Sequence, residues 1–130
     1  MINYPYFPDD EFERIGSDSE RMNIAFMERL TSLREEINQP LPLTSAWRSE
    51  ARNQQVGGTQ HSAHLYGRAV DLRVHGDTAY RVVAMAPRFG FTGIGVKQHG
   101  ILRHRYIHLD DLEFMGISKD HIRPRIWSYK

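Results

Sequence analysis

Apolar residues recur at spacings of three and four between residues 22 and 37, which predicts an amphipathic helix there. The apolar positions are Met22, Phe26, Leu30, Leu33 and Ile37. The preceding segment S-D-S-E has the form of a capping box, in which Ser17 and Glu20 each satisfy an open backbone N–H. We therefore expect the helix to follow this box directly and to end at residues 38–42.

Several shorter segments have strand patterns. Residues 68–74 alternate, with Val70 on the aliphatic face and Asp71 on the other, which is the period of a half-buried strand. Residues 43–46, 91–96 and 105–110 also read as strands. We expect Asp71 to face away from the aliphatic row.

Two further helices have N-cap residues. Ser49 precedes a short polar helix that stops at the glycine pair 57–58, and Asp77 precedes a helix that continues to about residue 86. Residues 59–67 read as polar loop. The pattern predicts an α+β fold, in which helices pack on a small, mostly antiparallel sheet within one domain, and residues 1–16 form an N-terminal extension.

The amino-acid composition limits the partners and the kinds of site that this chain can have. The 130 residues include 17 Lys and Arg and 16 Asp and Glu, so the net charge of +1 gives no global attraction to nucleic acid or an anionic membrane. The absence of cysteine excludes disulfides, thiolate zinc sites and cysteine nucleophiles, while seven histidines leave His, Asp and Glu as metal ligands. Residues 1–10 resemble neither a secretory signal nor a membrane span, so we expect a soluble protein made in the cytoplasm.

His64, Asp71 and His108 form a candidate metal-ligand set. Two imidazole nitrogens and one carboxylate oxygen suit Zn²⁺, and three protein ligands leave the fourth position open, as in catalytic zinc sites. The set can meet if His64 lies on the loop entering a strand, Asp71 lies along that strand and His108 lies on the neighbouring one. From spacing alone, a His and an Asp seven positions apart more often form a hydrogen-bonded couple than a pair of metal ligands.

A resemblance to a known family begins at the motif S-x-H-x-x-G-x-A-x-D. Its positions are filled by Ser62, His64, Gly67, Ala69 and Asp71. The motif resembles the signature of the zinc D-alanyl-D-alanine carboxypeptidase family, which is related to bacterial dipeptidases, phage endolysins and the hedgehog fold. Residues 44–58, 90–96 and 106–110 are similar to further segments of the family, and residues 123–129 are similar to the tail of small phage-encoded members. The resemblance covers nearly the whole chain from about Ser17.

This resemblance implies a hedgehog/D-Ala-D-Ala peptidase-like fold and zinc ligands at His64, Asp71 and His108. It also implies that Arg48 pairs with a substrate carboxylate or stabilises the developing oxyanion, and that Ser62 supports the site by hydrogen bonding. A surface salt bridge is the alternative role for Arg48.

The chain departs from the family where a second acid or base is expected. Members carry a carboxylate three positions before the last histidine ligand or a histidine two positions before it, and this chain has Arg105 and Tyr106 there. His104, Tyr106 and Asp110 share the strand face of His108, so they are the candidate catalytic groups. Tyr106 suits donation to an oxyanion, Asp110 suits either a base or an orienting role, and His104 has the right chemistry but lies in a basic loop.

These observations predict a monomeric zinc metallopeptidase that hydrolyses peptide bonds in peptidoglycan stem peptides, either as a D-Ala-D-Ala carboxypeptidase or as an endolysin-type endopeptidase. The phage-like tail and the missing signal favour a phage lysis enzyme released by other means, or a virion-associated one. One alternative is a catalytically inactive zinc-containing module that binds peptidoglycan or a partner. A nucleic-acid-binding or structural phage domain is the other, although the short basic clusters are more typical of solvated surface.

Overall fold

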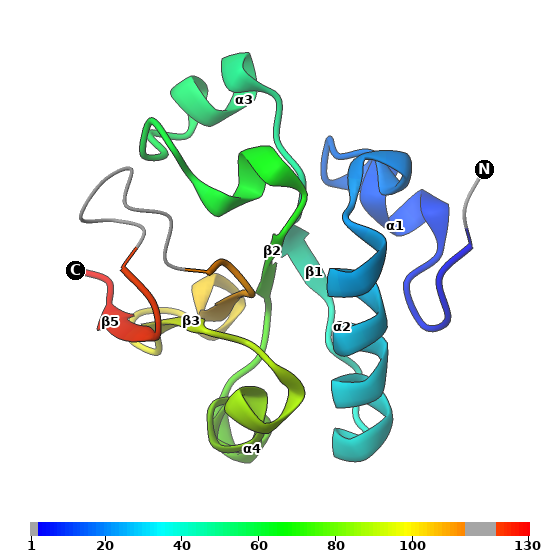
Figure 1. Ribbon diagram of the computed structural model, residues 1–130. Helices are drawn as coiled ribbons and strands as arrows, with labels where there is room; N and C mark the ends of the chain where they lie inside the picture. Colours follow the sequence, from blue (N-terminus) through cyan, green and yellow to red (C-terminus); the bar gives the residue numbers. More distant parts are fainter. Residues whose placement is uncertain (1–2, 114–121) are drawn as a thin grey trace.

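The computed structural model describes residues 3–113 and 122–130, whose elements surround one mixed sheet (Figure 1). In chain order the elements are α1 (Asp9–Arg14), η1 (Ser19–Arg21), α2 (Ile24–Ile37), β1 (Leu43–Ser45), α3 (Glu50–Gln55), η2 (Ala63–Tyr66), β2 (Ala69–Leu72), α4 (Gly76–Met85), η3 (Ala86–Phe89), β3 (Gly93–Lys97), η4 (Leu102–His104), β4 (Tyr106–Asp110) and β5 (Arg125–Ser128). No helix in this part of the chain is long and apolar enough to cross a membrane.

The sheet has the strand order β1-β2-β4-β3-β5. Its first three pairings are antiparallel, and only β3 and β5 pair in parallel. The expected α+β fold with a mostly antiparallel sheet is therefore confirmed. Strand β5 was not expected, because one of its faces carries arginines and aromatic residues rather than an aliphatic row.

The two faces of the sheet have different roles. Val70 and Leu72 of β2 and Ile107 and Leu109 of β4 are fully buried in the main core, together with residues of α2 and α4. Their neighbours along the strands, including Asp71 and His108, point to the other face because side chains alternate along a strand. In Figure 1, α4 lies below the strands and α3 lies above them. The polar face is therefore the one next to α3 and η2.

Helix α2 begins later than its sequence suggests. Its N-cap is Asn23, whose side chain accepts a hydrogen bond from the Phe26 N–H at 2.9 Å, and the Asn23 N–H donates to the Gly67 carbonyl. The predicted capping box is wrong: Asp18 instead caps the short helix η1, and the Ser17 hydroxyl donates to the Trp47 carbonyl at 2.8 Å. Ser17 is therefore engaged in a tertiary hydrogen bond, and Asn23 provides the local cap of α2.

Four other expectations differ from the structure. Helix α4 is N-capped by His75, so Asp77 lies in its first turn. Strand β2 is buried on both faces rather than half-buried, and residues 63–66 within the expected loop form η2, which contacts β2. The segment expected to be an N-terminal extension contributes Phe7 and Phe12 to the main core.

Candidate metal centre

His64, Asp71 and His108 meet on the polar face of the sheet. Asp71 and His108 are register partners on β2 and β4, and His64 comes from η2. The Asp71 Oδ1 atom lies 3.1 Å from His108 Nδ1 and 3.4 Å from His64 Nε2. One ligand atom from each residue lies within 4.8 Å of the others, and all three residues are buried. We call these residues the triad.

Local backbone structure places His64. The Ser62 hydroxyl accepts the His64 N–H at 3.2 Å and caps η2, and the helix ends at Gly67 in the left-handed region. A Cβ atom at Gly67 would lie 2.1 Å from the Arg21 carbonyl oxygen, so only glycine fits the close approach. The His64 Nδ1–H donates to the Ala46 carbonyl at 2.8 Å. This bond leaves Nε2 as the nitrogen that faces Asp71.

His108 is oriented by a buried carboxylate. Its Nε2–H donates to Asp110 Oδ2 at 2.8 Å, which leaves Nδ1 facing Asp71. Arg123 donates to both oxygens of Asp110, at 2.9 and 2.8 Å. Asp110 is 0% exposed, so its charge is balanced by these neighbours rather than by water.

The two triad histidines have opposite pKa shifts. Burial lowers the pKa of His64 despite the nearby Asp71. Burial alone would also lower the pKa of His108, but its hydrogen bonds to Asp110 and Asp71 outweigh burial and raise that pKa to about 9. Burial would raise the pKa of Asp71, yet the two imidazoles hold it well below its usual range. In the metal-free protein, the carboxylate is therefore ionised, His64 is neutral and His108 is protonated at neutral pH.

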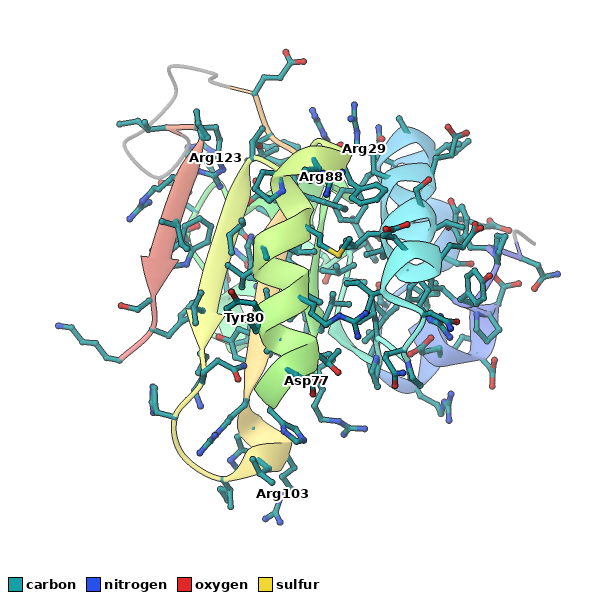
Figure 2. The ribbon with its side chains drawn as sticks, turned by 90° about the horizontal axis from the view of Figure 1, so that it is seen from below. Arg29, Asp77, Tyr80, Arg88, Arg103 and Arg123 are labelled. Carbon is teal, nitrogen blue, oxygen red and sulfur yellow. The ribbon has the colours of Figure 1, made fainter. Side chains whose placement is uncertain are left out.

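The triad lies in a cavity of about 450 Å³, and one wall of the cavity is built by the C-terminal strand. Every second residue of this segment lines the cavity: Arg123, Arg125, Trp127 and Tyr129. Figure 2 shows Arg123 at the end of β5 where that strand begins.

Two glycines of β3 let this wall reach the triad. β3 lies between β4 and β5, and its Gly93 and Gly95 are the register partners of Asp110 and His108. A Cβ atom at Gly95 would lie 2.7 Å from Trp127 Nε1, and one at Gly93 would lie 2.3 Å from Asp110 Oδ1. Because β3 has no side chains at these positions, the Trp127 ring packs 5.1 Å from the His108 ring.

The sequence of this chain matches a known family over most of its length. A profile of the family described as Peptidase M15 matches residues 9–110. The chain belongs to the peptidase M15 family. A comparison with curated proteins finds no match. Because the family match ends at Asp110, the cavity wall formed by β5 lies outside the matched region.

The donor set of this M15 peptidase fits a metal ion. M15 peptidases are metal-dependent, and the triad offers two imidazole nitrogens and one carboxylate oxygen from buried side chains. Each ring nitrogen that faces away from Asp71 is engaged by a carbonyl or a carboxylate, which is the arrangement that fixes the orientation of metal-ligating histidines.

Arg48 of the M15 peptidase lies beside the triad and is held in place. Its Nε–H donates to Ser45 Oγ at 3.1 Å, and its Nη1 donates to Asn53 Oδ1 at 3.2 Å. Its Nη2 lies 3.7 Å from Asp71 Oδ2, and the side chain is 17% exposed. Arg48 is thus a partly buried guanidinium in the cavity wall rather than a surface salt bridge.

The three residues nominated as acid, base or oxyanion group are placed differently. Tyr106 lines the cavity, Asp110 is enclosed between His108 and Arg123, and His104 lies exposed in η4 and does not line the cavity. Figure 2 shows η4, marked by Arg103, and Arg123 at opposite ends of the sheet.

Sequence reasoning missed several cavity residues. Arg123 was part of a short basic cluster interpreted as solvated surface, Tyr129 was part of a tail noted only for its similarity, and His61 was part of a polar loop. The alternation of R-P-R-I-W-S-Y is the signal that could have found the first two, because a strand would place its arginines and aromatic residues on one face.

Proposed function

We propose that this M15 peptidase is a zinc enzyme that hydrolyses peptide bonds in peptidoglycan stem peptides. The observation that carries the proposal is the buried triad of His64, Asp71 and His108 in a cavity that also presents Arg48 and Tyr106. The mixed nitrogen and oxygen donors favour zinc over the oxygen-preferring divalent ions.

Zinc would be held by His64 Nε2, His108 Nδ1 and an Asp71 oxygen. When bound with an open position, it supplies a Lewis acid and lowers the pKa of a water to about 7. The chain's own residues then bind the peptide, stabilise charge and transfer protons.

Arg48 and Tyr106 are the groups that stabilise negative charge on the carbonyl oxygen of the substrate. Burial, followed by the charge of Asp71, raises the pKa of Tyr106, so its hydroxyl keeps its proton. The ring centroid of Tyr129 lies 5.1 Å from that of Tyr106 and 6.4 Å from that of Trp127, so the three aromatic side chains pack together in the cavity wall.

Asp110 acts as a positioning residue. Both of its oxygens are engaged by Arg123, and one also accepts from His108. Hydrogen bonds to His108 and Arg123 overcome the effect of burial and hold the pKa of Asp110 well below its usual range, which makes it a poor proton acceptor. Its role is to fix the ring of His108 with Nδ1 toward the metal.

Proton transfer to the leaving amine requires a different group, for which we propose His61. Among the described residues that line the cavity, His61 is the imidazole outside the triad. Imidazole is the side chain that most often performs general acid–base chemistry. His61→Gln should therefore lower kcat while zinc content stays at one equivalent, and an unchanged kcat would remove His61 from the mechanism.

Peptidoglycan as the substrate is supported by the resemblance of residues 62–71 to the D-Ala-D-Ala carboxypeptidase signature and by the arginines of the cavity, which suit an acidic peptide. The tail similarity further supports a phage enzyme acting on the cell wall.

Mass spectrometry of defined muropeptides tests this function. The zinc-loaded protein should convert a muropeptide into two products whose masses sum to the substrate plus one water, and the products identify whether the terminal or an internal bond is cut. His104→Ala is the matched control and should cleave at the wild-type rate. Zinc-loaded protein that binds muropeptides without cleaving them would instead favour an inactive binding module.

A further inference from the structure

The C-terminal segment, residues 123–129, presents two arginines with different surroundings to the cavity. Arg123 has a side chain that is 5% exposed and donates to both oxygens of Asp110. Arg125 is exposed, and no carboxylate within residues 3–113 and 122–130 forms an ion pair with it. Arg125 thus carries a positive charge into the cavity that the described part of the protein does not neutralise.

Aromatic stacking holds the Arg125 guanidinium near the triad. Its Cζ atom lies 5.2 Å from the centroid of the Trp127 ring. The Trp127 ring in turn lies 5.1 Å from the ring of His108. A guanidinium stacked on an indole keeps the N–H groups at its edge available, and its loss of side-chain freedom on binding is small.

The strand order places Arg125 and Arg48 on opposite sides of the triad. Arg48 follows β1 at one edge of the sheet, Asp71 and His108 lie on the neighbouring inner strands β2 and β4, and Arg125 lies on β5 at the other edge. Both arginines line the same cavity. A peptide that crosses the triad from edge to edge would therefore meet one guanidinium on each side of the bond held over the metal.

We propose that Arg125, stacked on Trp127, is a binding subsite for a carboxylate of the peptide substrate, on the side of the triad away from Arg48. This proposal rests on the proposed peptidase function. The planar guanidinium presents paired N–H donors that match a carboxylate, and a carboxamide in its place loses the charge-assisted bonds. The subsite selects acidic peptides and is built by a strand beyond the family match.

The test compares acidic peptides with their neutral counterparts. Peptides in which one carboxylate at a time is replaced by a carboxamide are assayed with the zinc-loaded wild type, Arg125→Gln, Arg125→Lys and Arg88→Gln. Arg88 is an exposed arginine of η3, which follows α4 on the other side of the sheet, so its variant is the matched control. Both kcat and KM are measured at low and moderate salt.

For one carboxylate position, the wild type and Arg88→Gln should prefer the acidic peptide by about tenfold in kcat/KM. Arg125→Gln should lose this preference through KM with kcat unchanged, and Arg125→Lys should keep part of it, because lysine retains the charge without the planar fork. A preference that Arg125→Gln retains at every position would overturn the proposal.

Failure of the proposed function gives a different pattern. If the wild type cleaves no peptide, calorimetric titration of the same peptide pairs still decides the subsite, because Arg125 acts on binding. Tighter binding of the acidic peptide that disappears in Arg125→Gln supports the subsite without catalysis. Equal binding of both peptides to the wild type contradicts it.

Discussion

Replacing Arg123 with methionine should destabilise the protein strongly, because the arginine neutralises a carboxylate that water does not reach. The two side chains are 5% and 0% exposed and share hydrogen bonds of 2.9 and 2.8 Å. Removing one partner of such a buried pair costs about 3–5 kcal/mol, which lowers the folding equilibrium constant roughly 100-fold to several thousandfold. Domains have net stabilities of about 5–15 kcal/mol, so the variant should fold with a much reduced margin.

Urea unfolding of the metal-free protein, followed by far-ultraviolet circular dichroism, measures this loss. With a slope of about 2 kcal/mol/M, the midpoint should fall by roughly 1.5–2.5 M. Arg88→Met is the matched control, because Arg88 is exposed, and it should change stability by at most about 0.5 kcal/mol. Arg123→Lys keeps the charge and should recover part of the loss.

The pH dependence of the stability loss shows whether Arg123 stabilises the protein as an ion-pair partner or only by packing. The pKa of Asp110 is lowered in the folded protein, so its ionised carboxylate contributes to the free energy of unfolding. This contribution is complete above the ordinary pKa of an aspartate, about 3.9, and is lost as pH falls through the pKa of Asp110 in the folded state. The difference between wild type and Arg123→Met should therefore be constant between about pH 5 and 8 and should shrink below about pH 4. A difference under about 1 kcal/mol, or one that does not shrink in acid, would refute the reasoning.

Four further predictions concern the cavity and its surroundings. Because the pKa of His108 is raised to about 9, zinc must displace the proton of this imidazole when it binds. Calorimetry in buffers of different ionisation enthalpy should therefore show about one proton released at pH 7, and the zinc affinity should rise with pH up to about 9. Tyr106→Phe should lower kcat by about 10²–10³ with zinc content unchanged, as measured by steady-state kinetics on purified protein. Gly95→Ala should force Trp127 to move and cost about 1–3 kcal/mol in urea unfolding, and unchanged stability would contradict the close packing. His104→Ala should leave both unfolding and peptide cleavage unchanged, because the residue is exposed and lies outside the cavity.

Residues governed by local periodicity could be predicted from the sequence. The spacing of apolar residues located α2, and the alternation within residues 68–74 correctly separated Asp71 from the aliphatic row of Val70 and Leu72. Asp71 and His108 lie on neighbouring strands with side chains on one face, so these two members of the proposed triad could be brought together once both strands were recognised. These predictions hold because strand geometry alone determines which side chains share a face.

Features that depend on distant pairing could not be predicted in the same way. The partner of Asp110 is Arg123, and recognising it requires knowing that β5 pairs in parallel with β3. The predicted capping box failed for a similar reason, since Ser17 hydrogen-bonds to Trp47, thirty residues away. Basic residues near a chain end are typical of solvated surface, and only tertiary structure places Arg123 and Arg125 in the cavity wall.

Coupled measurement of zinc binding and peptide cleavage tests most directly whether the triad makes this protein a peptidase. Metal-stripped protein is titrated with zinc while cleavage of a muropeptide is followed by mass spectrometry, in parallel with His64→Ala. Cleavage by the wild type should rise in proportion to added zinc and stop rising at one equivalent, and His64→Ala should stay folded but bind zinc weakly and cleave little. Equal cleavage with and without zinc, or full cleavage by His64→Ala, would contradict the proposed centre.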